Sequence, residues 1–245
     1  MIALTYEEAV DRQAEELART LDLLRSLDEH EWSAPTDCPA WDVRRMYLHV
    51  LGACEAGARV RENARQMAAA LRWRRREGGP LEAALSGVQV REREHLSPRE
   101  LMARLADVAP ATVRARRRLP APARRYVRIP VDGPVRETWT LGYLAGTIYL
   151  RDLWMHRVDA ARATGRPLVL TADHDGRIVA DVVAEWARRH ARPFVLELGG
   201  EAGGRYESDP GAGAPERLEM DAVEFCRTLA GREEGKNLLA TVVPF

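Results

Sequence analysis

The sequence predicts an α+β protein, with a four-helix bundle over residues 1–166 and a small α+β domain over residues 167–245. Two observations predict this division. Before Pro167, four segments carry apolar residues at helical spacing and begin at residues that commonly cap helices. After Pro167, short apolar runs alternate with glycine-rich turns, which is typical of short strands. The fold class is therefore a helical bundle with a mixed domain attached.

The first two helices of the bundle are predicted from their N-terminal caps. Thr5 and Glu8 have the spacing of a capping box and begin an amphipathic segment that reaches residue 27. Asp42 is the expected cap of a second long helix. No strong helix breaker follows until the sequence EGGP at residues 77–80, so we expect one continuous helix over this range.

The third and fourth helices are predicted in the same way. Ser97 and Glu100 form a second capping box, and the helix that follows runs towards residue 118. The proline-rich sequence LPAPARRYVRIPVDGP then predicts an extended connection. Thr140 can cap the fourth helix, which Gly165 and Pro167 end.

The domain after Pro167 is predicted to combine helices and short strands. A helix is expected over residues 171–190, and Asp221 with Glu224 should cap another that reaches residue 231. The expected strands are FVLEL, RYES, RLEM and the C-terminal LLATVVPF.

Composition excludes several classes of protein. No window approaches the roughly 20 apolar residues of a membrane span, and the acidic N-terminus is unlike a signal peptide, so we expect a cytoplasmic protein without a membrane partner. The sequence carries no signal for a particular oligomeric state. Cys38, Cys54 and Cys226 lack C-x-x-C spacing, which predicts buried thiols rather than disulfides or a zinc finger.

The formal charge is zero, but the basic residues are unevenly distributed. Residues 59–128 contain 18 arginines and 7 acidic residues. This excess could form a positive rim for anionic ligands. No nucleic-acid-binding motif accompanies the arginine runs, so we expect no nucleic-acid partner.

The fourth predicted helix places polar residues on its apolar face. At about 100° per residue, Asp152, His156 and Asp159 fall on the same side as Ile148 and Met155. Buried polar groups need partners, because an unpaired one costs on the order of 2–7 kcal/mol. Asp152 and His156 are four residues apart and could bind one metal ion from the same side of the helix.

His49 on the second predicted helix is the best candidate for a third ligand. It follows Met46 and precedes Val50 on a face that borders the core. Two imidazoles and a carboxylate would leave one position open on a tetrahedral zinc ion, as in catalytic sites. The alternative is a buried hydrogen-bonded cluster of His49, Asp152 and His156 without metal.

The neighbouring polar residues are expected to have structural roles. Asp159 is expected to pair with an arginine, Arg45 or Arg157. Cys54 lies five residues after His49 and so off its face, which argues against a Cys–His nucleophile pair. The remaining histidines are expected to be structural or exposed: His30, His95, His174 and His190.

Three segments resemble the mycothiol-dependent maleylpyruvate isomerase family, whose N-terminal domain is a DinB-like four-helix bundle. They are EWSAPTDCPAWDVRRMYLHV, RDLWMHRVDAARATG and DAVEFCRTLAGR, and the similarity extends over nearly the whole chain. The resemblance implies a zinc ion held by His49, Asp152 and His156, and mycothiol as the thiol cosubstrate. It also implies a catalytic arginine in the C-terminal domain, which Arg232 matches, with Arg227 as the alternative.

The resemblance predicts a zinc-dependent enzyme that uses mycothiol to isomerise or conjugate a small electrophilic, anionic substrate. The acidic ligand of the characterised isomerases is a glutamate, whereas Asp152 is one methylene shorter. One alternative is a non-catalytic metal-binding or ligand-binding DinB-like protein. A bulky residue such as Trp154 that blocks the open coordination position would favour this alternative. A further alternative is metal-assisted hydrolysis.

Overall fold

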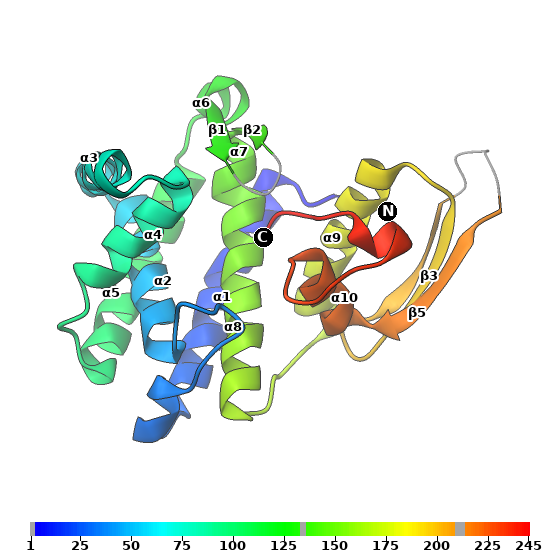
Figure 1. The fold of residues 1–245 in the computed structure, drawn as a ribbon, viewed down its shortest axis with the longest axis horizontal. Coiled ribbons are helices and arrows are strands. Elements are labelled where there is room, and N and C mark those ends of the chain that lie inside the picture. Colours follow the sequence, from blue (N-terminus) through cyan, green and yellow to red (C-terminus); the bar gives the residue numbers. More distant parts are fainter. Residues whose placement is uncertain (1–2, 133–135, 209–213) are drawn as a thin grey trace. The chain divides into compact units, whose positions relative to one another are not determined.

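The computed structural model describes residues 3–132, 136–208 and 214–245, and it consists of two compact units (Figure 1). One unit is Tyr6–Arg166, and the other joins Pro167–Phe245 to the residues before Tyr6. The first is helical apart from one small hairpin and the second is mixed, so the predicted α+β fold class is confirmed. None of the helices in the described residues is both long enough and apolar enough to cross a membrane.

Four helices form the body of the helical unit (Figure 1). They are α1 (Tyr6–Arg25), α2 (Val43–Ala58), α5 (Pro98–Arg117) and α8 (Tyr149–Thr164). α1 packs against α5 and α8, and α2 packs against the same two helices. Each contributes apolar side chains to one buried core, which includes Leu17, Leu24, Met46, Leu51, Leu101, Leu105 and Leu153. Burial of this shared apolar surface is the main force that holds the four helices together.

The predicted capping residues mark the helix ends in the structure. The Asp42 side chain accepts a hydrogen bond from the Arg45 amide, and Ser97 forms its capping box with Glu100. The Thr140 side chain accepts from the Tyr143 amide. Each bond satisfies a backbone donor that the helix itself leaves unpaired.

The expected second long helix is broken, which corrects that prediction. Arg59 is extended, and it separates α2 from α3 (Val60–Glu77). Only Gln66 and Ala70 are buried in α3, so its charged sequence offers the main core almost no apolar surface. α3 packs instead against α4 (Leu81–Arg91), a helix that is not predicted from the sequence.

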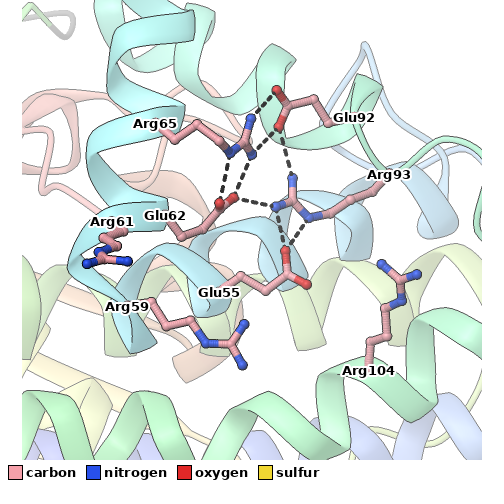
Figure 2. A pocket seen from close by; sticks show the side chains of 8 residues that line it. All are labelled: Glu55, Arg59, Arg61, Glu62, Arg65, Glu92, Arg93 and Arg104. Atoms are coloured by element: carbon pink, nitrogen blue, oxygen red, sulfur yellow. Dashed lines mark hydrogen bonds and ion pairs between the residues drawn. The ribbon is translucent and has the colours of Figure 1, made fainter.

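Ion pairs connect this α3–α4 hairpin to α2 (Figure 2). Arg65 on α3 pairs with Glu92 at the end of α4 at 2.7 Å and with Glu62 at 2.6 Å. Arg93 is buried, and its Nε donates to Glu55 of α2 at 2.8 Å. Because Arg93 also contacts Glu62, one network spans all three helices.

The start of the fourth predicted helix contains a π-helical turn. A short α-helical turn, α7 (Leu141–Tyr143), is followed by the π turn Leu144–Ile148 and then by α8. The buried Gln13 side chain of α1 donates to the carbonyl oxygens of Ala145 and Gly146, at 2.9 and 2.6 Å. Gln13 thereby provides hydrogen-bond donors for two carbonyl oxygens of the π turn. The π turn itself shifts the helical phase of the residues that follow it.

The proline-rich connection is only partly extended, which corrects another prediction. It begins as a short helix, α6 (Ala121–Tyr126), because Pro120 and Pro122 suit the start of a helix. It continues into β1 (Arg128–Asp132), which pairs antiparallel with β2 (Arg136–Thr140). The hairpin leads directly into α7.

The second unit packs helices on a three-stranded sheet (Figure 1). Its elements are a π turn at Ala172–Gly176, α9 (Arg177–His190), β3 (Phe194–Gly199), β4 (Gly204–Ser208), β5 (Glu216–Asp221), α10 (Ala222–Leu229) and a 3₁₀ turn at Asn237–Ala240. The strand order is β4-β3-β5, with β3 antiparallel to β4 and parallel to β5. The buried Trp186 ring contacts Phe194 and Phe225 edge-on and so joins both helices to the sheet.

Two details of this unit differ from the prediction. The N-terminal residues belong to it, because the Leu4 amide donates to Asp181 at 2.7 Å and Arg177 donates to the Ala3 carbonyl. The C-terminal LLATVVPF is not a strand. It forms a 3₁₀ turn and then a segment in which the Val243 amide donates to the Leu229 carbonyl of α10. Pro244 has no amide hydrogen with which to continue a ladder.

Candidate metal centre

Three predicted ligands come together between α2 and α8. His156 Nε2 lies 3.3 Å from Asp152 Oδ1, and His49 Nε2 lies 3.8 Å from Asp152 Oδ2. The two imidazole rings meet edge to face with centroids 5.6 Å apart. The potential ligand atoms of all three residues lie within 4.8 Å of one another. The carboxylate of Asp152 therefore stands between two imidazole nitrogens.

This donor set suits a divalent metal ion. A tetrahedral site with bonds of about 2.0–2.1 Å separates its ligand atoms by about 3.4 Å, close to the observed spacings. Both ring nitrogens of the buried His156 also lack a hydrogen-bond partner among the described residues. Within those residues, no fourth histidine, cysteine or carboxylate joins the group, so the residues fit a three-ligand centre.

A chain of side-chain amides fixes the orientation of His49. The carbonyl oxygen of Gly52 can only accept hydrogen bonds, and it accepts one from Gln66 Nε2 at 3.0 Å. Gln66 Oε1 then accepts from Gln89 Nε2 at 3.0 Å, which leaves Gln89 Oε1 at 2.8 Å from His49 Nδ1. This contact is a hydrogen bond only if Nδ1 carries the proton. In the neutral ring Nε2 is then the bare nitrogen, and Nε2 is the atom that faces Asp152.

Gly52 allows this chain to form. A Cβ atom at that position would lie 2.6 Å from the Cβ of Gln89, closer than real side chains approach. Glycine therefore permits α4 to approach α2 closely enough for Gln89 to reach His49. A larger residue would push the two helices apart.

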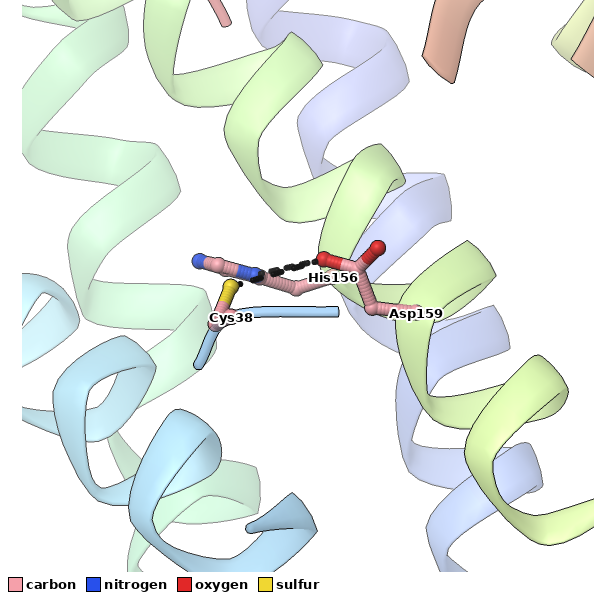
Figure 3. Close-up of side chains that lie close together, drawn as sticks. All are labelled: Cys38, His156 and Asp159. Carbon is pink, nitrogen blue, oxygen red and sulfur yellow. Dashed lines mark hydrogen bonds and ion pairs between the residues drawn. The ribbon is translucent and has the colours of Figure 1, made fainter. Parts of the chain in front are cut away.

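His156 has a carboxylate on its other side (Figure 3). Its Nδ1 lies 3.6 Å from Oδ2 of Asp159, a residue with no exposed surface, and Cys38 Sγ lies 3.7 Å from the same oxygen. A carboxylate beside the second nitrogen of a metal-binding histidine typically holds the ring in place. Of the arginines expected to pair with Asp159, Arg45 contacts Glu94 and Arg157 contacts Glu16.

The ionisable groups of the centre influence one another strongly. Burial would raise the pKa of Asp152, but the nearby imidazoles of His156 and His49 outweigh burial and lower it. Burial would likewise lower the pKa of His156, but the carboxylates of Asp152 and Asp159 outweigh burial and raise it well above its ordinary value. Without a metal ion, the structure thus favours a negative Asp152 beside a protonated His156.

The surroundings of the centre are aromatic on one side and open at Asp152. Trp41 stacks on His49 with centroids 5.1 Å apart, and the Tyr47 hydroxyl donates to the His156 carbonyl at 3.3 Å. The His156 side chain is 5% exposed, whereas that of Asp152 is 31% exposed. A ligand would therefore approach from the side of Asp152.

The other predicted residues lie elsewhere. Arg232 is half-buried in the turn after α10, where its amide donates to the Arg227 carbonyl. Arg227 is buried and pairs with Glu224 and Glu233. Both belong to the second compact unit.

The cysteine predictions had mixed outcomes. Cys54 and Cys226 are buried as predicted, and burial raises the pKa of the Cys54 thiol. Cys38 is only half-buried and lies beside Asp159, which corrects the expectation that all three thiols are buried.

Sequence reasoning missed the residues that support the ligands. Gln89 lies on α4, a helix that is not predicted from the sequence, so its closeness to His49 could not be predicted either. Trp41 and Cys38 precede α2 in the sequence TDCPAWD, which belongs to a segment that carries the family resemblance but gave no role to either residue.

The fold and the centre together define a class: a helical bundle with a two-histidine, one-carboxylate group between two of its helices, joined to a small α+β unit. Residues 13–161 match the family described as "Mycothiol maleylpyruvate isomerase N-terminal domain". The match covers more than half of the chain, and the chain belongs to this family. No curated protein matched the sequence.

Two solved structures have the same fold. One is the crystal structure of the mycothiol-dependent maleylpyruvate isomerase, with a TM-score of 0.60 and 18% sequence identity. The other is a variant of that enzyme in which a histidine is replaced by alanine, with a TM-score of 0.59 and the same identity. Each comparison covers 95% of this chain and 93% of the other.

Proposed function

We propose that this protein is a metal-dependent enzyme that uses mycothiol to isomerise or conjugate a small electrophilic, anionic substrate. The observation that carries the proposal is the approach of His49 Nε2 and His156 Nε2 to the two oxygens of Asp152. Membership of the mycothiol maleylpyruvate isomerase family supports the choice of thiol. His49, Asp152 and His156 would hold the metal ion, and zinc suits two imidazoles and one carboxylate.

The protein's own residues prepare the centre for this chemistry. The hydrogen bond to Gln89 keeps the proton on Nδ1 of His49 and leaves Nε2 available to a metal ion. The carboxylate of Asp159 lies beside Nδ1 of His156 and orients that ring. Trp41 stacks on one face of the His49 ring. A bound zinc ion would lower the pKa of a thiol so that it reacts as the thiolate near neutral pH.

The reaction that follows needs no redox cofactor. The thiolate sulfur would form a bond to one alkene carbon of a cis-enedioate, and the π electrons would move onto the conjugated carbonyl oxygen. The former double bond can then rotate. Return of the electrons restores the alkene in its trans form and expels the thiolate. With an electrophile that cannot eliminate in this way, the same attack ends as transfer of the thiol.

An arginine is the expected partner for a substrate carboxylate, because its guanidinium can bind both oxygens. We assign this role to Arg232, which is half-buried. Arg227 is less suited, because its guanidinium is buried against Glu224 and Glu233. Replacing Arg232 should raise KM for an anionic substrate more than it changes thiol binding.

Metal content and mycothiol binding, measured on the same samples, test the proposal. The wild type, His156→Ala and His95→Ala should be compared, since His95 is exposed and serves as the matched control. We expect about one zinc ion per chain and saturable thiol binding in the wild type and in His95→Ala, and loss of both in His156→Ala. A wild type that binds no metal when zinc is supplied would contradict the proposal. Metal without thiol binding would favour the non-catalytic alternative.

Thiol dependence separates the proposal from metal-assisted hydrolysis. Conversion of an electrophilic substrate by the zinc-loaded wild type should stop when mycothiol is omitted. Turnover that continues without any thiol would instead identify a metal-bound water as the nucleophile.

A further inference from the structure

A second hollow, separate from the metal centre, lies in the helical unit beside α2, α3, α4 and α5 (Figure 2). It has a volume of about 450 Å³, enough for a small ligand. None of the three candidate metal ligands lines it. The lining residues are all charged: Glu55, Arg59, Arg61, Glu62, Arg65, Glu92, Arg93 and Arg104.

The three glutamates of this pocket already have arginine partners. Glu55 binds Arg93, and Glu92 binds Arg65, while Glu62 binds both arginines. Hydrogen bonds from Arg65, together with one from Gln66, lower the pKa of Glu62 to about 2 despite burial. Each of the three carboxylates thus contacts Arg65 or Arg93, and these two arginines offset two of the three negative charges.

The other three arginines have no such partners. Within the described part of the chain, the side chains of Arg59, Arg61 and Arg104 form no hydrogen bond or ion pair, and Figure 2 draws no contact to them. They come from separate places, namely the α2–α3 junction, the first turn of α3, and α5. The Arg59 side chain does not cap α3 either. These three exposed guanidinium groups line one hollow, and within the described residues none of them forms an ion pair with a glutamate of the pocket.

We propose that this pocket binds a small multivalent anion of the phosphate or polycarboxylate class through Arg59, Arg61 and Arg104. Five guanidinium groups and three carboxylates leave a surplus positive charge in the hollow, which a multivalent anion would neutralise. Guanidinium groups bind phosphate and carboxylate oxygens in pairs, so three of them can hold one such anion. The pocket uses part of the arginine excess of residues 59–128 that the metal centre leaves unexplained.

The Arg65–Arg93 network gives the site a fixed wall. Arg93 is buried and links Glu55 on α2 to Glu62 on α3, while Arg65 links Glu62 to Glu92 at the end of α4. These bonds hold in place the backbone that carries Arg59 and Arg61. The anion would therefore meet a prearranged site, which lowers the entropy cost of binding.

Calorimetric titration of the full chain at low salt with inorganic phosphate, and separately with citrate, tests the proposal. We expect one saturable site in the wild type. Its affinity should fall at least tenfold in Arg59→Gln/Arg104→Gln. The matched control is Arg72→Gln/Arg99→Gln, which removes the same charge from exposed positions outside the pocket and should change the affinity less than threefold. Unchanged melting temperatures would show that the variants are folded.

The two probes and one further variant complete the test. Stronger binding of phosphate than citrate would assign the site to phosphorylated ligands, and the reverse to polycarboxylates. His156→Ala should bind the anion as tightly as the wild type, so the result does not depend on the metal centre. The proposal is overturned if neither anion saturates the wild type, if both double variants weaken binding equally, or if His156→Ala abolishes it.

Discussion

Gln89 Oε1 lies 2.8 Å from Nδ1 of His49, and this contact leaves Nε2, which faces Asp152, as the nitrogen without a proton in the neutral ring. The direction of the hydrogen bond follows from Gly52 O, which can only accept, through two side-chain amides. Gln89 is thus a positioning residue. It lies on α4, a helix outside the four-helix body.

Replacing Gln89 with leucine should weaken metal binding about 10- to 100-fold, the usual effect of removing such a supporting partner. Leucine cannot accept a hydrogen bond from Nδ1, so the neutral His49 ring can carry its proton on either nitrogen. Chelator competition measures the affinity, and ¹⁵N NMR of the metal-free protein should show a mixture of tautomers in place of the Nδ1-protonated form. Gln89→Glu keeps the acceptor and is the control. An unchanged affinity and tautomer in Gln89→Leu would disprove the assignment.

Asp159→Asn should also weaken metal binding, by about tenfold, because the carboxylate that holds the His156 ring becomes a neutral amide. Cys38→Ser is the matched control, since Cys38 contacts the same Asp159 oxygen and a serine hydroxyl can still donate to it. We expect that variant to remain within threefold of the wild type. Metal titration of both variants distinguishes the two roles, and a larger loss in Cys38→Ser would point to the cysteine as a ligand.

The charge of Asp152 should matter more than its length. Asp152→Asn keeps the shape but removes the negative charge between two imidazoles, so metal affinity should fall at least tenfold. Asp152→Glu keeps the negative charge and lengthens the side chain by one methylene, for which the partly exposed position of Asp152 leaves room. We expect this variant to keep about one metal ion per chain by elemental analysis. Equal binding by the asparagine variant would remove Asp152 from the ligand set.

The elements of the fold that could be predicted are those encoded by local signals. Asp42, Ser97 and Thr140 mark helix starts through their own side chains. The strands β3, β4 and β5 contain the short segments FVLEL, RYES and RLEM, which turn residues separate in the sequence. The break at Arg59 could not be predicted, because no local breaker causes it. It arises because α3 packs on α4 instead of the main core.

The candidate site divides in the same way. The spacing of Asp152 and His156 on one helix is visible in the sequence, and His49 follows from helical periodicity. The partners Gln89 and Asp159 depend on how the helices pack. The sequence predicts an arginine partner for Asp159, whereas its closeness to His156 depends on side-chain conformation and could not be predicted.

Glu62 should make stability depend on pH in the acid range. Arg65 and then Gln66 donate hydrogen bonds that outweigh burial and lower its pKa to about 2, from an ordinary 4.5. A lowered pKa stabilises the folded state above the ordinary value, and that contribution is lost as the pH falls from about 4.5 to about 2. It corresponds to about 1–3 kcal/mol of unfolding free energy.

Urea unfolding of the wild type and Glu62→Gln between pH 7 and pH 2.5 measures this contribution. The variant should be less stable by a constant amount above about pH 5, and the difference should shrink steadily below pH 4.5, because the unfolded wild-type chain then binds a proton at Glu62 that the folded state does not. Glu234→Gln, at an exposed position, is the control. A difference between wild type and Glu62→Gln that stays constant down to pH 2.5 would show that the pKa of Glu62 is not lowered in the folded protein, and it would contradict the assignment of Arg65 and Gln66 as the groups that favour its ionised form.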